Sequence, residues 1–169
     1  MDKQVVWNGK ISGETIFERE YEPSYAGKSF QIDGGYICIG ILTDDTGVFR
    51  SYVYSMLDKP GNLLWTTHNP WPTTYEQNLE QYPLQVIYNN GFIYIFYGEM
   101  HGIKLDSKGN ILWLKRFTFP HDQFNSVMMN RNQNFVLLAT HRDIDGDAIE
   151  DDKGEVFVIE IDTDGKIID

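Results

Sequence analysis

The chain has little of several features that would assign it to a familiar class of protein. It has one cysteine, Cys38, so no disulfide can form within it. Cys38 lies in the apolar run 35–40, where an inert buried thiol is expected rather than a nucleophile. No apolar run approaches the roughly 20 residues of a membrane-spanning helix, and residues 1–7 contain no apolar segment of signal-peptide length. We therefore expect a soluble chain.

Basic residues and catalytic motifs are also scarce. The 14 Lys and Arg residues face 25 Asp and Glu residues, which gives a net charge of −11. Phosphate backbones repel such a chain, so we expect no nucleic-acid partner. The sequence has no Gly-x-Ser-x-Gly, no His-Glu-x-x-His and no phosphate-binding glycine loop. No segment shows a capped 3.6-residue period, and aromatics make up 14% of the chain, so strands are expected.

A short glycine-led segment recurs along the chain. Its four copies are Gly13-Glu-Thr-Ile-Phe17, Gly61-Asn-Leu-Leu-Trp65, Gly109-Asn-Ile-Leu-Trp113 and Gly165-Lys-Ile-Ile-Asp169. Successive glycines are 48, 48 and 56 residues apart. A repeat of this length indicates an array of one supersecondary unit.

Each unit is expected to contain four antiparallel strands, A to D. An aspartate stands three residues before each of the last three glycines, which is typical of a type I turn between strands C and D. A second hairpin lies upstream, and its A–B turns are Asp33-Gly-Gly35, Asn89-Asn-Gly91 and 130–134. The sequence therefore predicts one all-β domain over 1–169, with blades at 29–66 and 84–117, an incomplete blade at 126–169, and the C–D hairpin of a split blade at 1–22.

The repeated residues resemble those of a known family. Asp-x-x-Gly-Asn-Ile-Leu-Trp after Ile-Lys-Leu, with Gly-Gly-Tyr-Ile-x-Ile-Gly upstream, resembles the blades of bacterial β-propeller repeat proteins related to the PQQ-binding-like family. The resemblance covers nearly the whole chain and implies an extracytoplasmic binding platform, scaffold or enzyme. Nothing matches the pocket for the quinone, so that cofactor is not expected.

About three four-stranded meander blades are fewer than the four to eight that close a propeller. Three arrangements follow: a piece of a longer propeller, a ring completed by a homo-oligomer, or a small open wedge capped by the N-terminal hairpin. The first two are favoured because the third leaves strand edges exposed.

The long connections between strands are candidates for binding. They are the B–C and D–A segments at 43–50, 66–83, 118–125 and 142–154, and a meander places them at one end of every sheet. All four histidines lie on or beside them: His68, His101, His121 and His141. Trp71 and Tyr75 are placed to stack on a sugar ring or a proline-rich peptide, or to pack the loop on its own scaffold. Trp65 and Trp113 follow the repeat and are expected to pack the blades.

The acidic segment 143–152 occupies the eight extra residues of the last repeat. Asp143, Asp145, Asp147 and Asp151 resemble the ligands of EF-hand-like calcium loops, since hard cations prefer several oxygens from a short segment. The glycine stands at the fourth position instead of the sixth, and Gly154 stands where a bidentate acid belongs. The alternatives are a calcium site and a solvated acidic loop; calcium is the one cofactor to test.

Two functions fit these patterns. The first is a non-enzymatic β-propeller module, a scaffold that binds a protein or carbohydrate through the face formed by the B–C and D–A loops. The alternative is a carbohydrate-active enzyme using the same face. An enzyme requires a concave pocket with convergent titratable groups, and the sequence identifies no catalytic residue.

Overall fold

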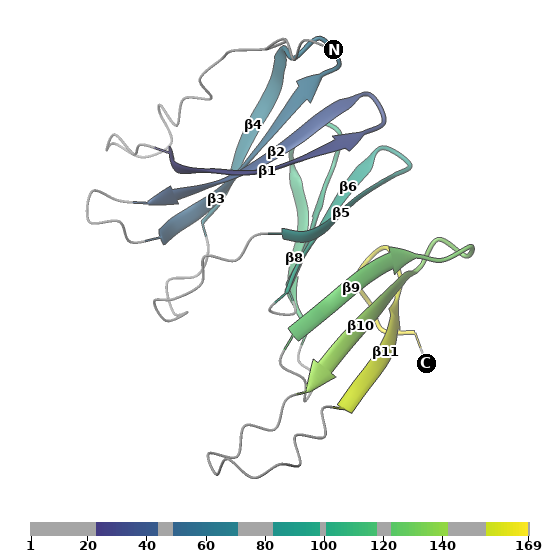
Figure 1. The fold of residues 1–169 in the computed structure, drawn as a ribbon. Coiled ribbons are helices and arrows are strands. Elements are labelled where there is room, and N and C mark those ends of the chain that lie inside the picture. Colours follow the sequence, from purple (N-terminus) through teal and green to yellow (C-terminus); the bar gives the residue numbers. More distant parts are fainter. Residues whose placement is uncertain are drawn as a thin grey trace, which may run out of the picture. The chain divides into compact units, whose positions relative to one another are not determined.

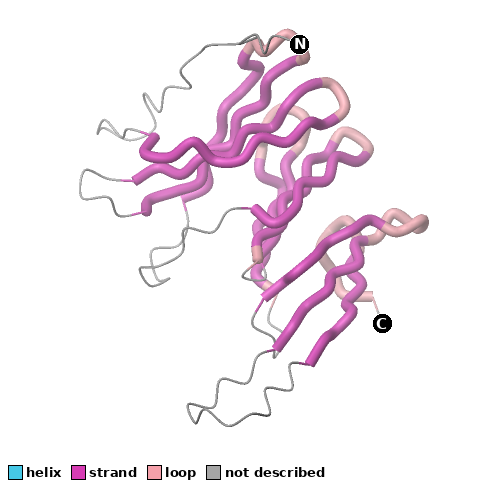
Figure 2. Tube along the Cα trace, viewed as in Figure 1, coloured by secondary structure: helices cyan, strands magenta, loops and turns pink. Residues whose placement is uncertain are grey.

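A computed structural model describes residues 23–43, 49–70, 83–98, 101–117, 123–141 and 155–168. These residues form eleven β-strands joined by turns, and they contain no helix (Figures 1 and 2). The hairpin expected at 1–22 lies outside them. The all-β class expected from the sequence is confirmed.

The strands form three antiparallel sheets in which consecutive strands are neighbours. Sheet I contains β1 (Pro23–Ile32), β2 (Gly35–Thr43), β3 (Phe49–Asp58) and β4 (Leu63–Pro70). Sheet II contains β5 (Pro83–Asn89), β6 (Phe92–Tyr97), β7 (His101–Leu105) and β8 (Ile111–Arg116). Sheet III contains β9 (Gln123–Met129), β10 (Phe135–His141) and β11 (Glu155–Ile161). The meander order expected for each repeat is confirmed.

Two strands extend further than the sequence pattern indicates. The expected connection at 66–83 is wrong in its first part, because β4 continues to Pro70, which pairs with Ser51 of β3. The β-branched Thr66 and Thr67 suit this extension, since they favour extended backbone. The first strand, expected from Ser29, begins at Pro23 and contains two register shifts.

The turns at the repeated aspartates have a shared geometry. Gly61 donates its N–H to the Asp58 carbonyl over 3.0 Å, and Asn62 donates to the Asp58 carboxylate over 2.7 Å. Gly165 and Asp162 form the equivalent backbone bond over 2.9 Å. The glycines have φ values of +95° and +69°, which L side chains rarely adopt. The aspartate and glycine of the repeat thus close a type I turn followed by a left-handed residue.

Contacts divide the chain into two compact units, one with sheet I and the segment 108–110, the other with the rest of sheets II and III. In the second unit the two sheets share an apolar core centred on Phe135. The ring centroid of Phe135 lies 4.7 Å from that of Tyr94 and 5.0 Å from that of Phe96. The other buried members are Phe117, Phe124, Val127, Leu137, Ala139 and Ile161. Aromatic residues of the repeat therefore hold one sheet against the next.

At some turns glycine is required both for its positive φ and for close packing against a neighbouring strand. A Cβ added at Gly165 would lie 2.9 Å from Cδ of Lys115, whereas one added at Gly91 would meet nothing within 4 Å. Both positions have positive φ, so either alanine costs about 1–2 kcal/mol of backbone strain. We expect Gly165→Ala to lower the free energy of unfolding by about 1 kcal/mol more than Gly91→Ala, because Lys115 must also move. Urea denaturation measures both, and equal losses would contradict the expected packing of the turn.

Candidate binding surface at the loop end

Each sheet has two unlike ends. Antiparallel order places the short turns after β1, β3, β5, β7 and β9 at one end, here named the turn end. The connections after β2, β6 and β10 leave from the opposite end, named the loop end. In Figure 2 the short turns are drawn pink at the turn end of each sheet. The long connections at 44–48 in sheet I and 142–154 in sheet III leave from the loop end as expected, but in sheet II the connection between β6 and β7 is only 98–100 and is shorter than the turn at 106–110.

Three of the four histidines lie near the loop end of their own sheets. His68 lies in the second half of β4, away from the turn that precedes this strand. His101 is the first residue of β7, and His141 is the last residue of β10. His101 is buried, with 5% of its surface exposed, between Tyr97 and Arg116 on the flanking strands. His101 is therefore part of the packed sheet at this end.

The other residues expected to bind lie outside the described residues. These are Trp71, Tyr75 and His121, and the acidic set Asp143, Asp145, Asp147 and Asp151. Stacking by the aromatic pair and calcium binding by the acidic set stay predictions. Within the described segments, no group of three or more His, Cys, Asp or Glu side chains is arranged to hold a metal ion.

His68 is the most unusual of the described histidines. Both ring nitrogens are shielded from solvent and have no hydrogen-bond partner among the described residues, and the same is true of Oγ of Ser51. His68 is opposite Val53 in the β3–β4 register, and Ser51 is two residues from Val53, so both residues face the same side of sheet I. Burial lowers the pKa of His68, which favours the neutral ring.

A row of small polar side chains crosses the same face of sheet I. Ser29 Oγ donates to Cys38 Sγ over 3.4 Å, and Cys38 is opposite Ser55. Ser55 and Thr66 share a 3.0 Å hydrogen bond between their hydroxyls. Cys38 is half-buried within this row. The row offers uncharged donors and acceptors, which suit a neutral polar group such as a hydroxyl.

Sequence reasoning did not identify this polar row. Its members lie on four strands and are joined only by register, so they have no spacing along the chain that would mark them. Period-2 alternation is the signal that was available, because Ser51, Val53 and Ser55 share one face of β3. Alternation alone does not reveal that Ser51 lacks a partner.

The best-connected charged group lies at the turn end instead. Nζ of Lys104 on β7 is 2.9 Å from Oδ1 of Asp164 in the turn after β11. Lys115 donates to the backbone oxygens of Asp164 and Gly165, and Nε1 of Trp113 donates to the Thr163 oxygen over 3.3 Å. This cluster fastens the turn of sheet III to β7 and β8 of sheet II. It confirms the packing role expected for Trp113.

The pair has perturbed ionisation for structural reasons. Burial by itself lowers the pKa of Lys104, but the hydrogen bond to Asp164, the interaction with Tyr94 and the charge of Asp164 together outweigh it, so the net pKa is raised. The hydrogen bond from Lys104 lowers the pKa of Asp164. Asp164 is 80% exposed, so solvent screens much of this attraction. Perturbed pKa values here mark a contact between sheets, not a catalytic centre.

No family model matches the chain, and no curated protein matches it. The described residues contain no helix with the length and apolarity that crossing a bilayer requires. The described residues define an all-β protein with three antiparallel meander sheets.

Neutral His68 makes the stability of the protein depend on pH. Its folded pKa is below the ordinary 6.5, so the unfolded chain binds a proton first and stability falls as the pH drops below 6.5. We expect His68→Gln to lose less stability than wild type between pH 7 and pH 5, since glutamine does not titrate there. Urea denaturation at each pH measures the difference. The same pH dependence in both proteins would contradict a buried neutral ring.

Replacing Lys104 tests the fastening of the turn. Lys104→Met removes the ammonium group, which lies 2.9 Å from Asp164 and 4.7 Å from the centroid of the Phe92 ring, and we expect a loss of about 0.5–1 kcal/mol at neutral pH. The Asp164 contribution is present above pH 3.8 and is lost as the pH falls through its lowered pKa, and the Lys104 contribution is lost above pH 10.5. The deficit should therefore shrink in strong acid. Lys166→Met, at an exposed position, is the control.

Proposed function

We propose that the chain is a non-enzymatic β-propeller-type module that binds a protein or carbohydrate through the loop end of its sheets. One observation carries this proposal: the connections longer than five residues, at 71–82, 117–122 and 142–154, all begin at the loop end of a sheet, whereas the turn end of each sheet has connections of at most five residues. A scaffold made rigid at one end leaves the opposite end free to vary in sequence without loss of the fold.

The packing of sheets II and III supports the propeller-type arrangement. A four-stranded meander stacks its apolar face on the next meander, and the turn at 162–165 is fastened to β7 and β8. The Asp-x-x-Gly turn and the Trp, which resemble those of PQQ-binding-like blades, thus form contacts between two sheets. A ring completed by further blades, from a longer protein or a second copy, belongs to the same proposal.

The sheet ends give the binding proposal a sharp test. Soluble xylo- and cello-oligosaccharides and a synthetic proline-rich peptide are added to 15N-labelled protein, and amide shifts are followed by NMR. We expect shifts at loop-end amides such as Thr43, His101 and His141, because the ligand contacts the connections beside them. The amides of the turns at 58–62 and 162–166 should stay unchanged and serve as the internal control.

Two results would count against this function. Shifts centred on the turn end, with the loop end unchanged, would place binding on the wrong surface. Release of reducing sugar from the oligosaccharides would favour the carbohydrate-active enzyme, which shares the loop end but requires turnover.

A further inference from the structure

Among the described residues, sheet III has three strands, whereas sheets I and II each have four. Among the described residues, β11 has one strand neighbour, β10, and it is the outer strand of the sheet in Figure 1. A short segment occupies the beginning of the fourth-strand position beside β11. Ile167 forms a bridge with Ile161, and the N–H of Ile168 donates to the Glu160 carbonyl over 2.9 Å. Beyond Glu160, no described residue continues along this edge.

The backbone of β11 has hydrogen-bonding groups directed at this edge. Peptide groups of alternate residues in an antiparallel strand point to the same side. The Glu160 carbonyl points away from β10, because it accepts a hydrogen bond from the N–H of Ile168. The N–H and C=O groups of Val158 and Val156 therefore point to the same side. Each copy of the chain therefore offers two donors and two acceptors over this short stretch.

The side chains on β11 are apolar yet exposed. Val158 is four residues before Asp162, as Tyr54 is before Asp58, but Val158 is 72% exposed whereas Tyr54 is fully buried. Val156 is 62% exposed, whereas its counterpart Tyr52 is 4% exposed. Leu138, the β10 partner of Val158, is also exposed. The repeat positions that are buried in a four-stranded sheet stay apolar here, although nothing described covers them.

The edge of β11 also has no protective irregularity. Natural edge strands are commonly interrupted by bulges, prolines or lysines that prevent pairing with another chain. Every other edge strand of the three sheets has a register shift in its pairing: β1, β4, β5, β8 and β9. The pairing of β11 with β10 has none, and β11 contains no Pro or Lys. The pairing of β11 with β10 thus runs without interruption from Glu155 to Ile161.

We propose that β11 pairs antiparallel with β11 of a second copy of this chain, about a twofold axis at Phe157. This register places Val156 of each copy opposite Val158 of the other, and these are the residues whose N–H and C=O groups face the edge. Four hydrogen bonds form, and no charged side chains are opposed. The same edge is used by both copies, as a twofold interface requires. The short segment at 166–168 leaves this stretch open.

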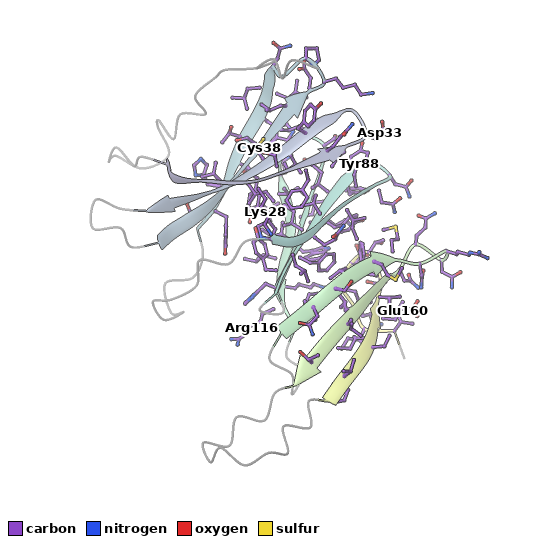
Figure 3. All side chains as sticks on the ribbon, viewed as in Figure 1. Lys28, Asp33, Cys38, Tyr88, Arg116 and Glu160 are labelled. Atoms are coloured by element: carbon purple, nitrogen blue, oxygen red, sulfur yellow. The ribbon has the colours of Figure 1, made fainter. Side chains whose placement is uncertain are left out.

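A second copy fits this edge better than an unrelated strand because the free groups are complementary to themselves. Donors and acceptors of Val156 match those of Val158 in the antiparallel direction, and the four valines form one apolar cluster across the joined sheets. Glu160, labelled in Figure 3, lies outside the paired stretch 156–158. Its carboxylate accepts hydrogen bonds from Asn130 and Asn134 over 2.8 and 2.7 Å. The interface is separate from the loop end.

Paired charge variants test the register. Sedimentation velocity over a concentration series should show a reversible monomer–dimer equilibrium for the wild type. V156K/V158K places like charges opposite each other twice, and we expect dimer affinity to fall by about tenfold or more. V156K/V158E places lysine opposite glutamate, and we expect dimerisation to return and to weaken with added salt. M128K adds a lysine to the same face on β9 and is the control that should still dimerise.

Circular dichroism confirms that each variant folds, and the two double variants differ in one side chain. A monomer at the highest concentration, an unchanged dimer in V156K/V158K, or a monomeric V156K/V158E would each overturn the proposal. A monomeric wild type that binds a synthetic peptide of the β8 segment 109–117 would assign the edge to a foreign strand, which also overturns pairing between copies.

Discussion

The structure depends on a turn that only a left-handed residue can close. Gly61 and Gly165 adopt positive φ after an aspartate that accepts hydrogen bonds from the turn backbone. This reverses the chain between the third and fourth strands, and in sheet III it also directs Asp164 and Thr163 onto Lys104 and Trp113 of the preceding sheet. One local conformation therefore determines both the hairpin and the attachment of one sheet to another.

Among the described turns, the same geometry appears once without glycine. In the turn after β9, Asn130 takes the place of aspartate, and Gln133 has a φ of +64°. The strained Gln133 accepts a 2.8 Å hydrogen bond from Asn90 in the corresponding turn of sheet II. Contact between turns thus offsets part of the backbone strain. In the second unit, hydrogen bonds at the turn end therefore join one sheet to the next.

Apolar side chains of sheets II and III differ in how far they are buried. The apolar faces of sheets II and III meet through Phe135 and its aromatic neighbours, whereas Val156 and Val158 on β11 stay in contact with solvent. An exposed apolar strand with free backbone groups is a ready site for another strand. The proposed pairing between copies and the proposed binding at the loop end use different parts of the sheets.

The sequence by itself determined the strands, the turns and their order, because Asp-x-x-Gly, Asn-Gly and apolar alternation act over a few residues. It could not locate the end of β4 at Pro70, which depends on pairing with β3, and so it placed His68 in a loop. Only the tertiary structure decided that His68 and Ser51 are shielded without partners among the described residues, that Lys104 meets Asp164 sixty residues away, and that β11 has one strand neighbour in the described part of the chain. These features depend on which strands lie side by side, and register between distant segments leaves no mark in local sequence.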